Sequence, residues 1–212
     1  GTVGDIGTSS FYPPHHMTMG EGGCVYTNDP LLNRLILSYR DWGRDCICKS
    51  GQDNLCGHRF DGQFGELPQG YDHKYVYSHF GFNLKATEMQ ASIGCAQLEK
   101  FPSFVEKRKE NFNALKEMLK CVEDKLILPE ACENSDPSWF GFMITCKDGV
   151  SKNKVVQYCE EKGVQTRMLF SGNIVRQPAF DGMRESGEGY RISGDLSVTD
   201  RVMNNSFWIG VY

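Results

Sequence analysis

Short apolar runs that end in turn residues open the chain, and they predict two strands followed by a helix. Residues 1–12 are expected to form a short strand that enters a turn, and residues 23–27 a second strand. Asp29 can cap the next helix, and Pro30 suits its first position. The apolar residues that follow recur at helical spacing: Leu31, Leu32, Leu35, Ile36 and Tyr39.

The periodic pattern is lost from Asp41 to Gly81. This segment is rich in glycine and aromatic residues and contains three cysteines. A segment of this length without regular structure is uncommon unless it is functional or disordered. Because its aromatic and cysteine content argues against disorder, we expect an ordered segment with a function.

Helical spacing of apolar residues returns at Leu84. It predicts a helix from Leu84 to Phe101, a break at Pro102 and then a second helix. The apolar residues expected on the buried side of the second helix are Phe104, Phe112, Leu115, Met118 and Leu119.

A smaller α/β unit is predicted beyond a boundary near residues 120–136. The pattern indicates strands over residues 139–146, 164–169 and 207–212, and helices over residues 152–162 and 199–204. The chain stops on a strand with no covering element after it. We therefore expect it to be part of a longer protein, truncated at both ends.

Composition and charge narrow the class of protein. The 212 residues are 40% apolar and 24% charged, which is typical of a globular protein, and the net charge is −4. That charge argues against nucleic acid as a partner, because phosphate binders usually carry a basic surface. The sequence contains no apolar run long enough for a membrane span and no pattern of a signal peptide. We expect a cytoplasmic protein that does not bind a membrane.

The nine cysteines are an odd number and fall into two groups. In a reducing compartment, clustered cysteines more often bind metal or take part in redox chemistry than form disulfides. Separated cysteines are usually small core residues. We assign six to this group: Cys24, Cys95, Cys121, Cys132, Cys146 and Cys159.

The other three cysteines are Cys46, Cys48 and, seven residues further on, Cys56. In an extended segment, side chains two residues apart face the same side, so the first two thiolates can converge on one metal. Three thiolates need a fourth ligand, and His58 is near enough in sequence to complete a Cys3His zinc site. Three packing cysteines remain the alternative.

The run from Ser10 to Gly23 is the most informative part of the sequence. It contains a strand end, a rigid Pro-Pro turn, the His15-His16 pair and a glycine-rich turn. Adjacent side chains of an extended segment point in different directions, which disfavours a zinc pair. The residues alone are compatible with an ordered turn that carries two surface histidines.

The same run resembles the Ser-Phe…Lys…Gly-Glu-Gly-Gly segment of the DegT/DnrJ/StrS sugar aminotransferases, which have the type I pyridoxal-phosphate fold. His15 stands at the position of the lysine that forms the Schiff base, and no lysine precedes Lys49. The pattern Phe-Tyr-Pro-x-His-His-x-Thr-Met-Gly-Glu-Gly-Gly is similar to one branch of that family. Its members are dehydrases that act at C3 of CDP-linked 4-keto-6-deoxyhexoses.

The resemblance implies a defined chemistry for His15. An imidazole cannot form a stable imine with the cofactor aldehyde, so the cofactor would rest as pyridoxamine 5'-phosphate (PMP). A base that titrates near neutrality could move a proton during elimination of the C3 hydroxyl. The family pattern further implies that Ser10 binds the cofactor phosphate and that Tyr12 contacts cofactor or substrate. It implies that Asn83 reaches the cofactor phosphate of the partner subunit in a homodimer; from the residues alone, Asn83 could cap the helix at Leu84.

The resemblance also changes the interpretation of the cysteines. In that branch the C-x-C-x7-C spacing completes a [2Fe-2S] cluster with a fourth cysteine far upstream, which is absent from this chain. Electrons for the second half of the reaction come from a separate NADH-dependent flavin and iron–sulfur reductase. This chain has no Gly-x-Gly-x-x-Gly of its own, as expected with an external donor.

Several basic and aromatic residues within a short span could clamp a nucleotide diphosphate, although a solvated loop is equally compatible. They are Arg59, Tyr71, Lys74, Tyr75, Tyr77 and Lys85. Arg167 resembles a family position near the active site that could pair with the substrate, with a surface arginine as the alternative.

The expected fold class is α/β, a type I pyridoxal-phosphate-dependent transferase-like fold. Residues 1–125 would be the C-terminal part of the cofactor-binding large domain, and residues 126–212 a truncated small domain. The main hypothesis is a PMP-dependent nucleotide-sugar 3-dehydrase of lipopolysaccharide O-antigen synthesis. The alternatives are a nucleotide-sugar aminotransferase and a zinc-binding module without catalysis.

Overall fold

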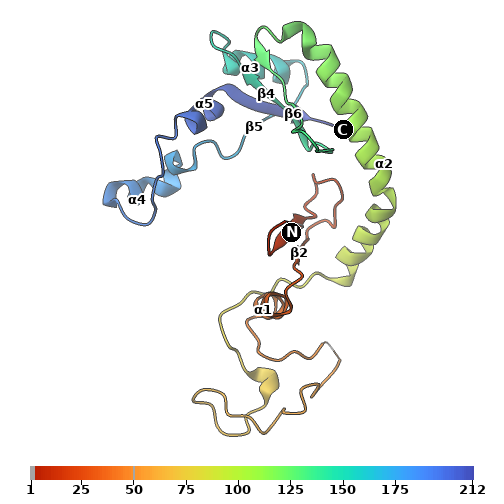
Figure 1. Ribbon diagram of the computed structural model, residues 1–212, viewed down its shortest axis with the longest axis vertical. Helices are drawn as coiled ribbons and strands as arrows, with labels where there is room; N and C mark the ends of the chain where they lie inside the picture. The colour runs from red at the N-terminus through yellow and green to blue at the C-terminus, as the bar shows by residue number, and fades with distance from the viewer. Residues whose placement is uncertain (1–2, 50) are drawn as a thin grey trace. The chain divides into compact units, whose positions relative to one another are not determined.

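The computed structural model describes residues 3–49 and 51–212 (Figure 1). By its internal contacts the chain separates into two compact units, Gly1–Phe101 and Pro102–Tyr212. Each unit is described by itself below. The domain boundary after residue 125 stays a prediction.

The first unit begins with the two strands that the sequence predicts. Strand β1 (Gly7–Ser10) pairs antiparallel with β2 (Gly23–Tyr26), and Ser10 lies opposite Gly23. Helix α1 (Pro30–Arg40) follows, with Pro30 in its first turn. The Asp29 carboxylate accepts hydrogen bonds from the backbone N–H groups of Leu31 at 2.7 Å and Leu32 at 3.1 Å. The predicted helix cap is therefore confirmed.

The glycine-rich segment is a long loop whose two ends meet after α1. Two isolated antiparallel bridges join these ends, one between Asp41 and Asn83 and one between Arg44 and Tyr77. The backbone N–H of Trp42 donates to the Phe82 carbonyl at 2.8 Å. Within the loop, the described regular structure is a single 3-10 turn, η1 (His73–Tyr75). We call the crossing of the two ends the neck of the loop.

Helix α2 (Glu88–Leu119) corrects two predictions. It begins at Glu88 instead of Leu84, because Thr87 and Gln90 form a cap. The Gln90 side chain accepts the Thr87 N–H at 2.8 Å, and the Thr87 hydroxyl accepts the Gln90 N–H at 3.3 Å.

The helix also continues through Pro102, which we expected to break it (Figure 1). Proline forfeits one backbone hydrogen bond, at a cost of about 3 kcal/mol in a helix interior. The turns beyond Pro102 bury Phe112 in the core and pack Leu115 and Leu119 against it. This burial of apolar surface outweighs the lost bond.

The second unit is built on a four-stranded antiparallel sheet with the order β3-β4-β6-β5. The strands are β3 (Leu126–Ile127), β4 (Gly141–Cys146), β5 (Thr166–Met168) and β6 (Ser206–Gly210). Helices α3 (Lys152–Glu161) and α5 (Ser197–Asn205) contact this sheet. Apart from β3, which was not predicted, these elements confirm the predicted ones within a few residues. The short pieces η2 (Lys120–Val122), η3 (Ile174–Arg176), η4 (Pro178–Phe180) and α4 (Asp181–Ser186) were not predicted.

One face of this sheet forms the core of the second unit. In β4, Phe142, Ile144 and Cys146 are buried, whereas Met143 between them is exposed. This alternation follows from the two-residue period of a strand. The centroids of the Phe142 and Phe112 rings are 4.9 Å apart.

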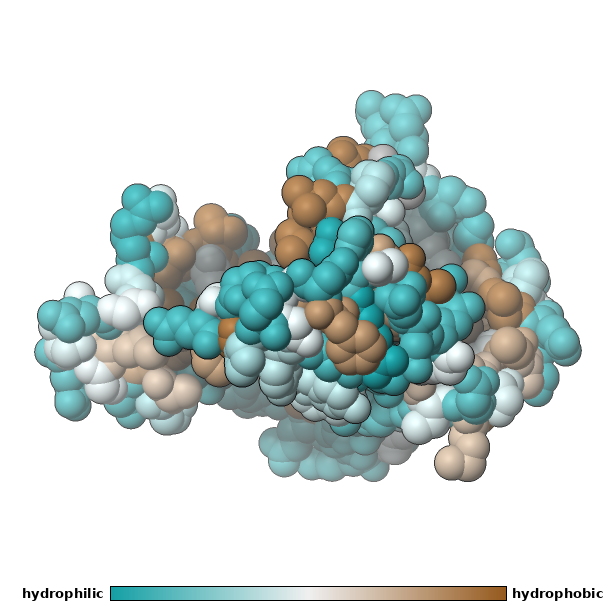
Figure 2. All heavy atoms as spheres, turned by 90° about the horizontal axis from the view of Figure 1, so that it is seen from below, coloured by the Kyte–Doolittle hydropathy of each residue, from teal (hydrophilic) through white to brown (hydrophobic). Residues whose placement is uncertain are grey.

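The prediction that the separated cysteines are core residues is largely wrong. Cys146 is buried and Cys159 is half-buried, but the other four are exposed: Cys24, Cys95, Cys121 and Cys132. Their elements bury few side chains among the residues that the structure describes, so a small apolar residue there has no core to join. Figure 2 accordingly shows apolar side chains interspersed with polar ones on the face it presents. In the described parts of the chain, no helix is both long and apolar enough to cross a membrane.

Candidate functional site

The loop between β1 and β2 forms a closed turn at residues 11–22. The backbone N–H of Phe11 donates to the Gly22 carbonyl at 2.8 Å, and the Phe11 carbonyl accepts the Met19 N–H at 2.9 Å. The Thr18 hydroxyl also donates to the Phe11 carbonyl, at 3.1 Å. Gly20 has a φ of +79°, a conformation that favours glycine, so the Gly-Glu-Gly-Gly sequence suits the return of the chain. We call this segment the hairpin loop.

Ser10, Tyr12 and His15 lie together at the start of the hairpin loop. The Ser10 hydroxyl oxygen accepts the Tyr12 N–H at 3.2 Å, and the His15 N–H donates to the Tyr12 carbonyl at 2.9 Å. The rings of Tyr12 and His15 meet edge to face, with 6.0 Å between centroids. His15 is half-buried and Tyr12 is exposed. The structure thus brings three of the predicted site residues into one turn, with an imidazole beside a phenol.

The hairpin loop is also in contact with helix α2. A Cβ atom added to Gly94 would lie 2.9 Å from Cγ of Met19, so the loop and the helix approach closely at this glycine. Met19 lies four residues after His15. The hairpin loop that carries His15 therefore packs against a helix that is distant in sequence.

Asn83 and Lys85 lie at the neck of the long loop. Asn83 is bridged to Asp41, whose carboxylate pairs with the Lys85 ammonium at 2.9 Å. The Lys85 nitrogen also lies 5.1 Å from the centre of the Trp42 ring. Two of the predicted binding residues are therefore at the neck, and one of them, Lys85, lies over an aromatic ring.

Arg44 also lies at the neck, but it was not predicted as a site residue. Its guanidinium carbon lies 5.2 Å from the ring centre of Trp42 and 5.9 Å from that of Tyr77. Its buried Nε has no hydrogen-bond partner among the described residues. The signal that could have identified it is its place between an aromatic residue and the cysteines, in Trp42-Gly43-Arg44.

Arg167 belongs to the second unit. It lies in β5 opposite Trp208 of β6, on the face of the sheet that carries exposed Met143. One of its guanidinium nitrogens donates to the Thr166 carbonyl at 3.0 Å. Its role in substrate binding stays a prediction.

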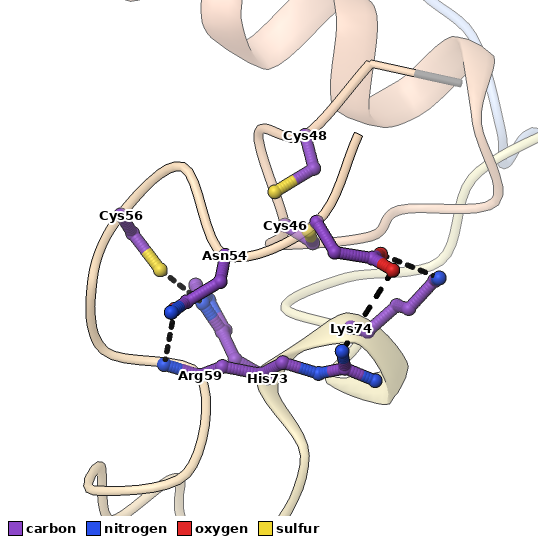
Figure 3. A pocket seen from close by; sticks show the side chains of 8 residues that line it. Cys46, Cys48, Asn54, Cys56, Arg59, His73 and Lys74 are labelled. Atoms are coloured by element: carbon purple, nitrogen blue, oxygen red, sulfur yellow. Dashed lines mark hydrogen bonds and ion pairs between the residues drawn. The ribbon is translucent and has the colours of Figure 1, made fainter. Parts of the chain in front are cut away.

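The three clustered cysteines line one small pocket in the long loop (Figure 3). The Cys48 sulfur accepts the Leu55 N–H at 3.4 Å, and the Cys56 sulfur accepts the His58 N–H at 3.4 Å. Burial raises the pKa of the Cys46 thiol, and the nearby Cys48 and Cys56 thiols oppose its ionisation. We call this group of side chains the thiol pocket.

His73 contacts the thiol pocket, and His58 does not take the predicted place. Nδ1 of His73 lies 3.7 Å from the Cys56 sulfur, whereas the His58 ring is hydrogen-bonded to Asp61 at 2.9 Å. In the described structure His58 is not among the residues that line the pocket, and its part in a Cys3His site stays a prediction. The loop returns through η1 and places a distant histidine at the sulfur, which proximity in sequence could not predict.

Hydrogen bonds and burial shift the pKa values of Cys56 and of two groups near it. The contact with His73 and the His58 N–H lower the pKa of the Cys56 thiol. Burial disfavours the charged form of His73, but its hydrogen bonds to Asp45 and Cys56 outweigh this and raise its pKa. Burial also acts against the ionised form of Asp45, yet the contacts with His73 and Ser78 lower its pKa.

Ion pairs on the other side of the pocket hold Arg59 and Lys74. The Arg59 guanidinium forms two hydrogen bonds with the Asp72 carboxylate, at 2.9 and 2.8 Å. Lys74 donates to Asp53 at 2.7 Å, and Arg59 lies 3.8 Å from the same carboxylate. Both cations therefore have carboxylate partners beside the thiols, as Lys85 has in Asp41, and their place in a nucleotide clamp stays a prediction.

The thiol pocket fits a metal group in its donor set. Three cysteines line one pocket, and the sulfurs of two already accept backbone N–H bonds of the kind that surround cluster sulfurs. Within residues 3–49 and 51–212, no three metal-binding side chains stand at ligand spacing. Binding would therefore require the thiol side chains to rotate toward one another.

Comparisons with known proteins agree along the whole chain. A model of the DegT/DnrJ/EryC1/StrS aminotransferase family matches residues 1–212. The chain is 56% identical over 214 residues to the lipopolysaccharide biosynthesis protein RfbH of Salmonella typhimurium, a match that covers 100% of this chain and 48% of that protein. It is 49% identical to dTDP-4-dehydro-2,6-dideoxy-D-glucose 3-dehydratase of Saccharopolyspora spinosa, covering 100% of this chain and 45% of that enzyme.

The fold agrees with solved structures. The chain resembles E. coli GDP-4-keto-6-deoxy-D-mannose-3-dehydratase with bound hydrated PLP, with a TM-score of 0.77 and 22% identity. The match covers 99% of this chain and 51% of that one. This likeness confirms the predicted α/β, pyridoxal-phosphate-dependent transferase type of fold. The chain spans about half the length of the relatives it matches.

Proposed function

Because the chain belongs to the DegT/DnrJ/EryC1/StrS aminotransferase family, we propose that it is part of a PMP-dependent enzyme that removes the C3 hydroxyl of a nucleotide-linked 4-keto-6-deoxyhexose. The observation that carries the proposal is His15, half-buried on a hairpin loop that contains no lysine. The name of the Saccharopolyspora spinosa relative, a 3-dehydratase, supports this reaction class. The name of RfbH supports a place in lipopolysaccharide synthesis.

Ser10 and Asn83 are the residues that would bind the cofactor phosphate. The Ser10 oxygen already accepts the Tyr12 N–H, so its own hydroxyl hydrogen can turn toward a phosphate oxygen. Ser10 and Asn83 are both exposed, as a binding role requires. Asn83 would act across the interface of a homodimer. When bound, PMP supplies the amine that condenses with the keto sugar and a ring that accepts electrons.

His15 would hold and move the proton in this reaction. An imidazole titrates near neutrality, so it can take a proton in one step and return it in another. The backbone bond to Tyr12 and the edge-to-face ring contact orient the side chain. Tyr12 is exposed and could donate a hydrogen bond to the departing hydroxyl of the sugar. Without a lysine on the loop, the exchange that completes an aminotransfer is not available to these residues.

Cys46, Cys48 and Cys56 would bind a [2Fe-2S] cluster, together with a fourth ligand from outside this chain. The shared pocket of the three thiols supports this assignment. A cluster of this kind passes single electrons. The two electrons needed for a 3-deoxy product would come from an NADH-dependent flavin and iron–sulfur reductase.

Lys85 and Arg167 would bind the substrate. A nucleotide sugar carries a charged diphosphate, and the Lys85 ammonium beside the Trp42 ring offers a cation and an aromatic face. We propose a cytidine diphosphate sugar as the substrate, by resemblance to the RfbH-like branch. Turnover of the CDP, GDP and dTDP forms of the same keto sugar would test this choice, and a preference for GDP or dTDP would contradict it.

The role of His15 is tested with the full-length protein and two variants. His15→Ala should abolish deuterium exchange from solvent at C4' of bound PMP, because the proton acceptor is gone, yet PMP should remain bound. His16→Ala is the matched control and should retain the exchange. Loss of exchange in His16→Ala with retention in His15→Ala would overturn the assignment of the base.

The cluster is tested by analysis of the purified full-length protein. We expect about two iron atoms and two sulfides per chain, as a [2Fe-2S] centre requires. Zinc without sulfide would contradict the electron relay. It would favour a Cys3His zinc module.

A further inference from the structure

We propose that His73 is a positioning residue for the thiol pocket: it holds the Cys56 sulfur by a hydrogen bond, and Asp45 and Phe64 fix its ring. The inference rests on the proposed function in one respect, since it takes Cys56 as a ligand of the metal group. Neither the cysteine spacing nor the comparisons assign a role to this histidine.

Geometry separates His73 from the other histidine of the loop. Nδ1 of His73 lies 3.7 Å from the Cys56 sulfur, within the range for a hydrogen bond to sulfur. The His73 side chain is 12% exposed, whereas the His58 side chain is 75% exposed. His73 is therefore an enclosed part of the pocket, and Figure 3 shows its ring directed at Cys56.

Two contacts fix the His73 ring. Nε2 is hydrogen-bonded to the Asp45 carboxylate at 2.6 Å. The Phe64 ring stacks on the imidazole with 4.8 Å between centroids and an interplanar angle of 6°. A ring held at one edge and on one face has little freedom to turn. Metal-bound side chains are commonly oriented by such outer contacts.

Asp45 is itself held in place. Its backbone N–H donates to the Val76 carbonyl at 3.0 Å, and Arg34 approaches its other carboxylate oxygen at 3.7 Å. The chain from Asp45 through His73 to Cys56 thus joins both strands of the long loop near the neck. The Cys56 sulfur is thereby linked to Asp45, next to the Arg44–Tyr77 bridge.

Cys56 needs such an anchor. Its neighbours Leu55 and Gly57 are exposed, and Gly57 has a φ of +70°. The sulfur receives one backbone hydrogen bond, from the His58 N–H at 3.4 Å. His73, seventeen positions further along the chain, adds a second hydrogen-bond partner. A metal-bound thiolate has no proton to donate, so the bond would then run from Nδ1–H to the sulfur.

Hydrogen bonds to cluster sulfurs raise the reduction potential and retain the metal. We expect that His73→Phe, which keeps an aromatic ring against Phe64, lowers the potential of the centre. We also expect it to lose iron to a chelator several-fold faster than the wild type. His73→Asn should restore most of both properties, because its amide can present an N–H near the position of Nδ1.

The experiment uses the full-length protein and follows iron and sulfide content, the potential from a redox titration, and the rate of iron loss. His58→Phe is the matched control and should behave as the wild type. If His73→Phe cannot be purified with iron, Asp45→Asn provides the second variant, because it keeps the ring but loosens it. A smaller shift in the same direction is expected for Asp45→Asn.

The inference would be overturned if His73→Phe kept the reduction potential and the rate of iron loss of the wild type. Where Asp45→Asn replaces that variant, the same criterion applies to it. Failure of the proposed function gives a different result. A wild type that contains zinc and no sulfide would contradict the electron relay, and zinc loss to the chelator would still decide the role of His73. A wild type that binds neither metal would overturn both proposals.

Discussion

Gly43 and His79 touch at the neck of the long loop. A Cβ atom added to Gly43 would overlap the carbonyl oxygen of His79, and Gly43 has a φ of +82°. The Gly43 carbonyl also accepts the Ser78 N–H at 3.0 Å. Glycine is therefore required here for its backbone conformation and for the space it leaves.

Substitution of Gly43 by alanine should open the neck. The methyl group would force the two ends of the loop apart, and the thiol pocket between them should become more mobile. Hydrogen exchange of residues 44–78 should accelerate in Gly43→Ala. Gly65→Ala is the matched control, since Gly65 also has a positive φ, +55°, but has nothing within 4 Å of an added Cβ. Equal exchange in the two variants would contradict the prediction.

Arg59 should not be replaceable by lysine. The guanidinium forms two parallel hydrogen bonds with Asp72, a geometry that an ammonium group cannot reproduce. We expect Arg59→Lys to increase proteolytic cleavage within the long loop at unchanged overall fold. Arg34→Lys serves as the control, because the Arg34 side chain is 60% exposed and its single ion pair spans 3.7 Å. Similar cleavage of both variants and the wild type would show that the paired hydrogen bonds to Asp72 are dispensable.

Phe142 should contribute strongly to the stability of the second unit. Its side chain is fully buried against Phe112, so Phe142→Ala leaves a cavity and should lower the free energy of unfolding by about 3–5 kcal/mol. Met143 lies next to it on the other face of β4 and is 39% exposed. Met143→Ala should cost much less. Urea unfolding of both variants measures the difference, and comparable losses would contradict the assignment of the core face.

Asp200 should make the stability of the second unit depend on pH. Hydrogen bonds from Arg176 and then Asn173 lower the pKa of this carboxyl group below its usual value. A depressed pKa means that the ionised carboxylate stabilises the native state above the unfolded pKa of about 3.9. That contribution is lost as the pH falls from there through the native pKa.

The test compares the wild type with Asp200→Asn in urea at pH 7 and pH 3. The wild type should be more stable at pH 7, and the difference should shrink at pH 3. Asp148→Asn, at an exposed turn, should track the wild type at both values. If the difference in free energy of unfolding between the wild type and Asp200→Asn did not depend on pH, the assigned role of the charge would be refuted.

The sequence predicts the elements whose local signals agree with one another. Asp29 and Pro30 start α1, and Ser151 caps α3, whose end is followed by Gly163 with a φ of +78°. At Pro102 the local rule failed, because burial of residues in later turns of α2 outweighs one lost hydrogen bond. Tertiary packing decides such cases, and a single sequence does not display it.

The candidate site was predictable where it is local. Ser10, Tyr12 and His15 are close in sequence and lie in one turn. His73 could not be predicted as the neighbour of Cys56, because they are seventeen positions apart and the loop between them has no periodic pattern. Arg44 was missed for a similar reason, since its partners Trp42 and Tyr77 meet only across the neck.

The neck has a consequence for how such a protein could change. An insert whose two ends touch can be exchanged for a shorter connection without moving the helices on either side. The bridge between Arg44 and Tyr77 marks the positions where such an exchange would join the chain. The segment with the thiols could therefore be replaced without changing the hairpin loop that carries His15. A relative could gain or lose the thiol pocket in one step and keep the rest of its architecture.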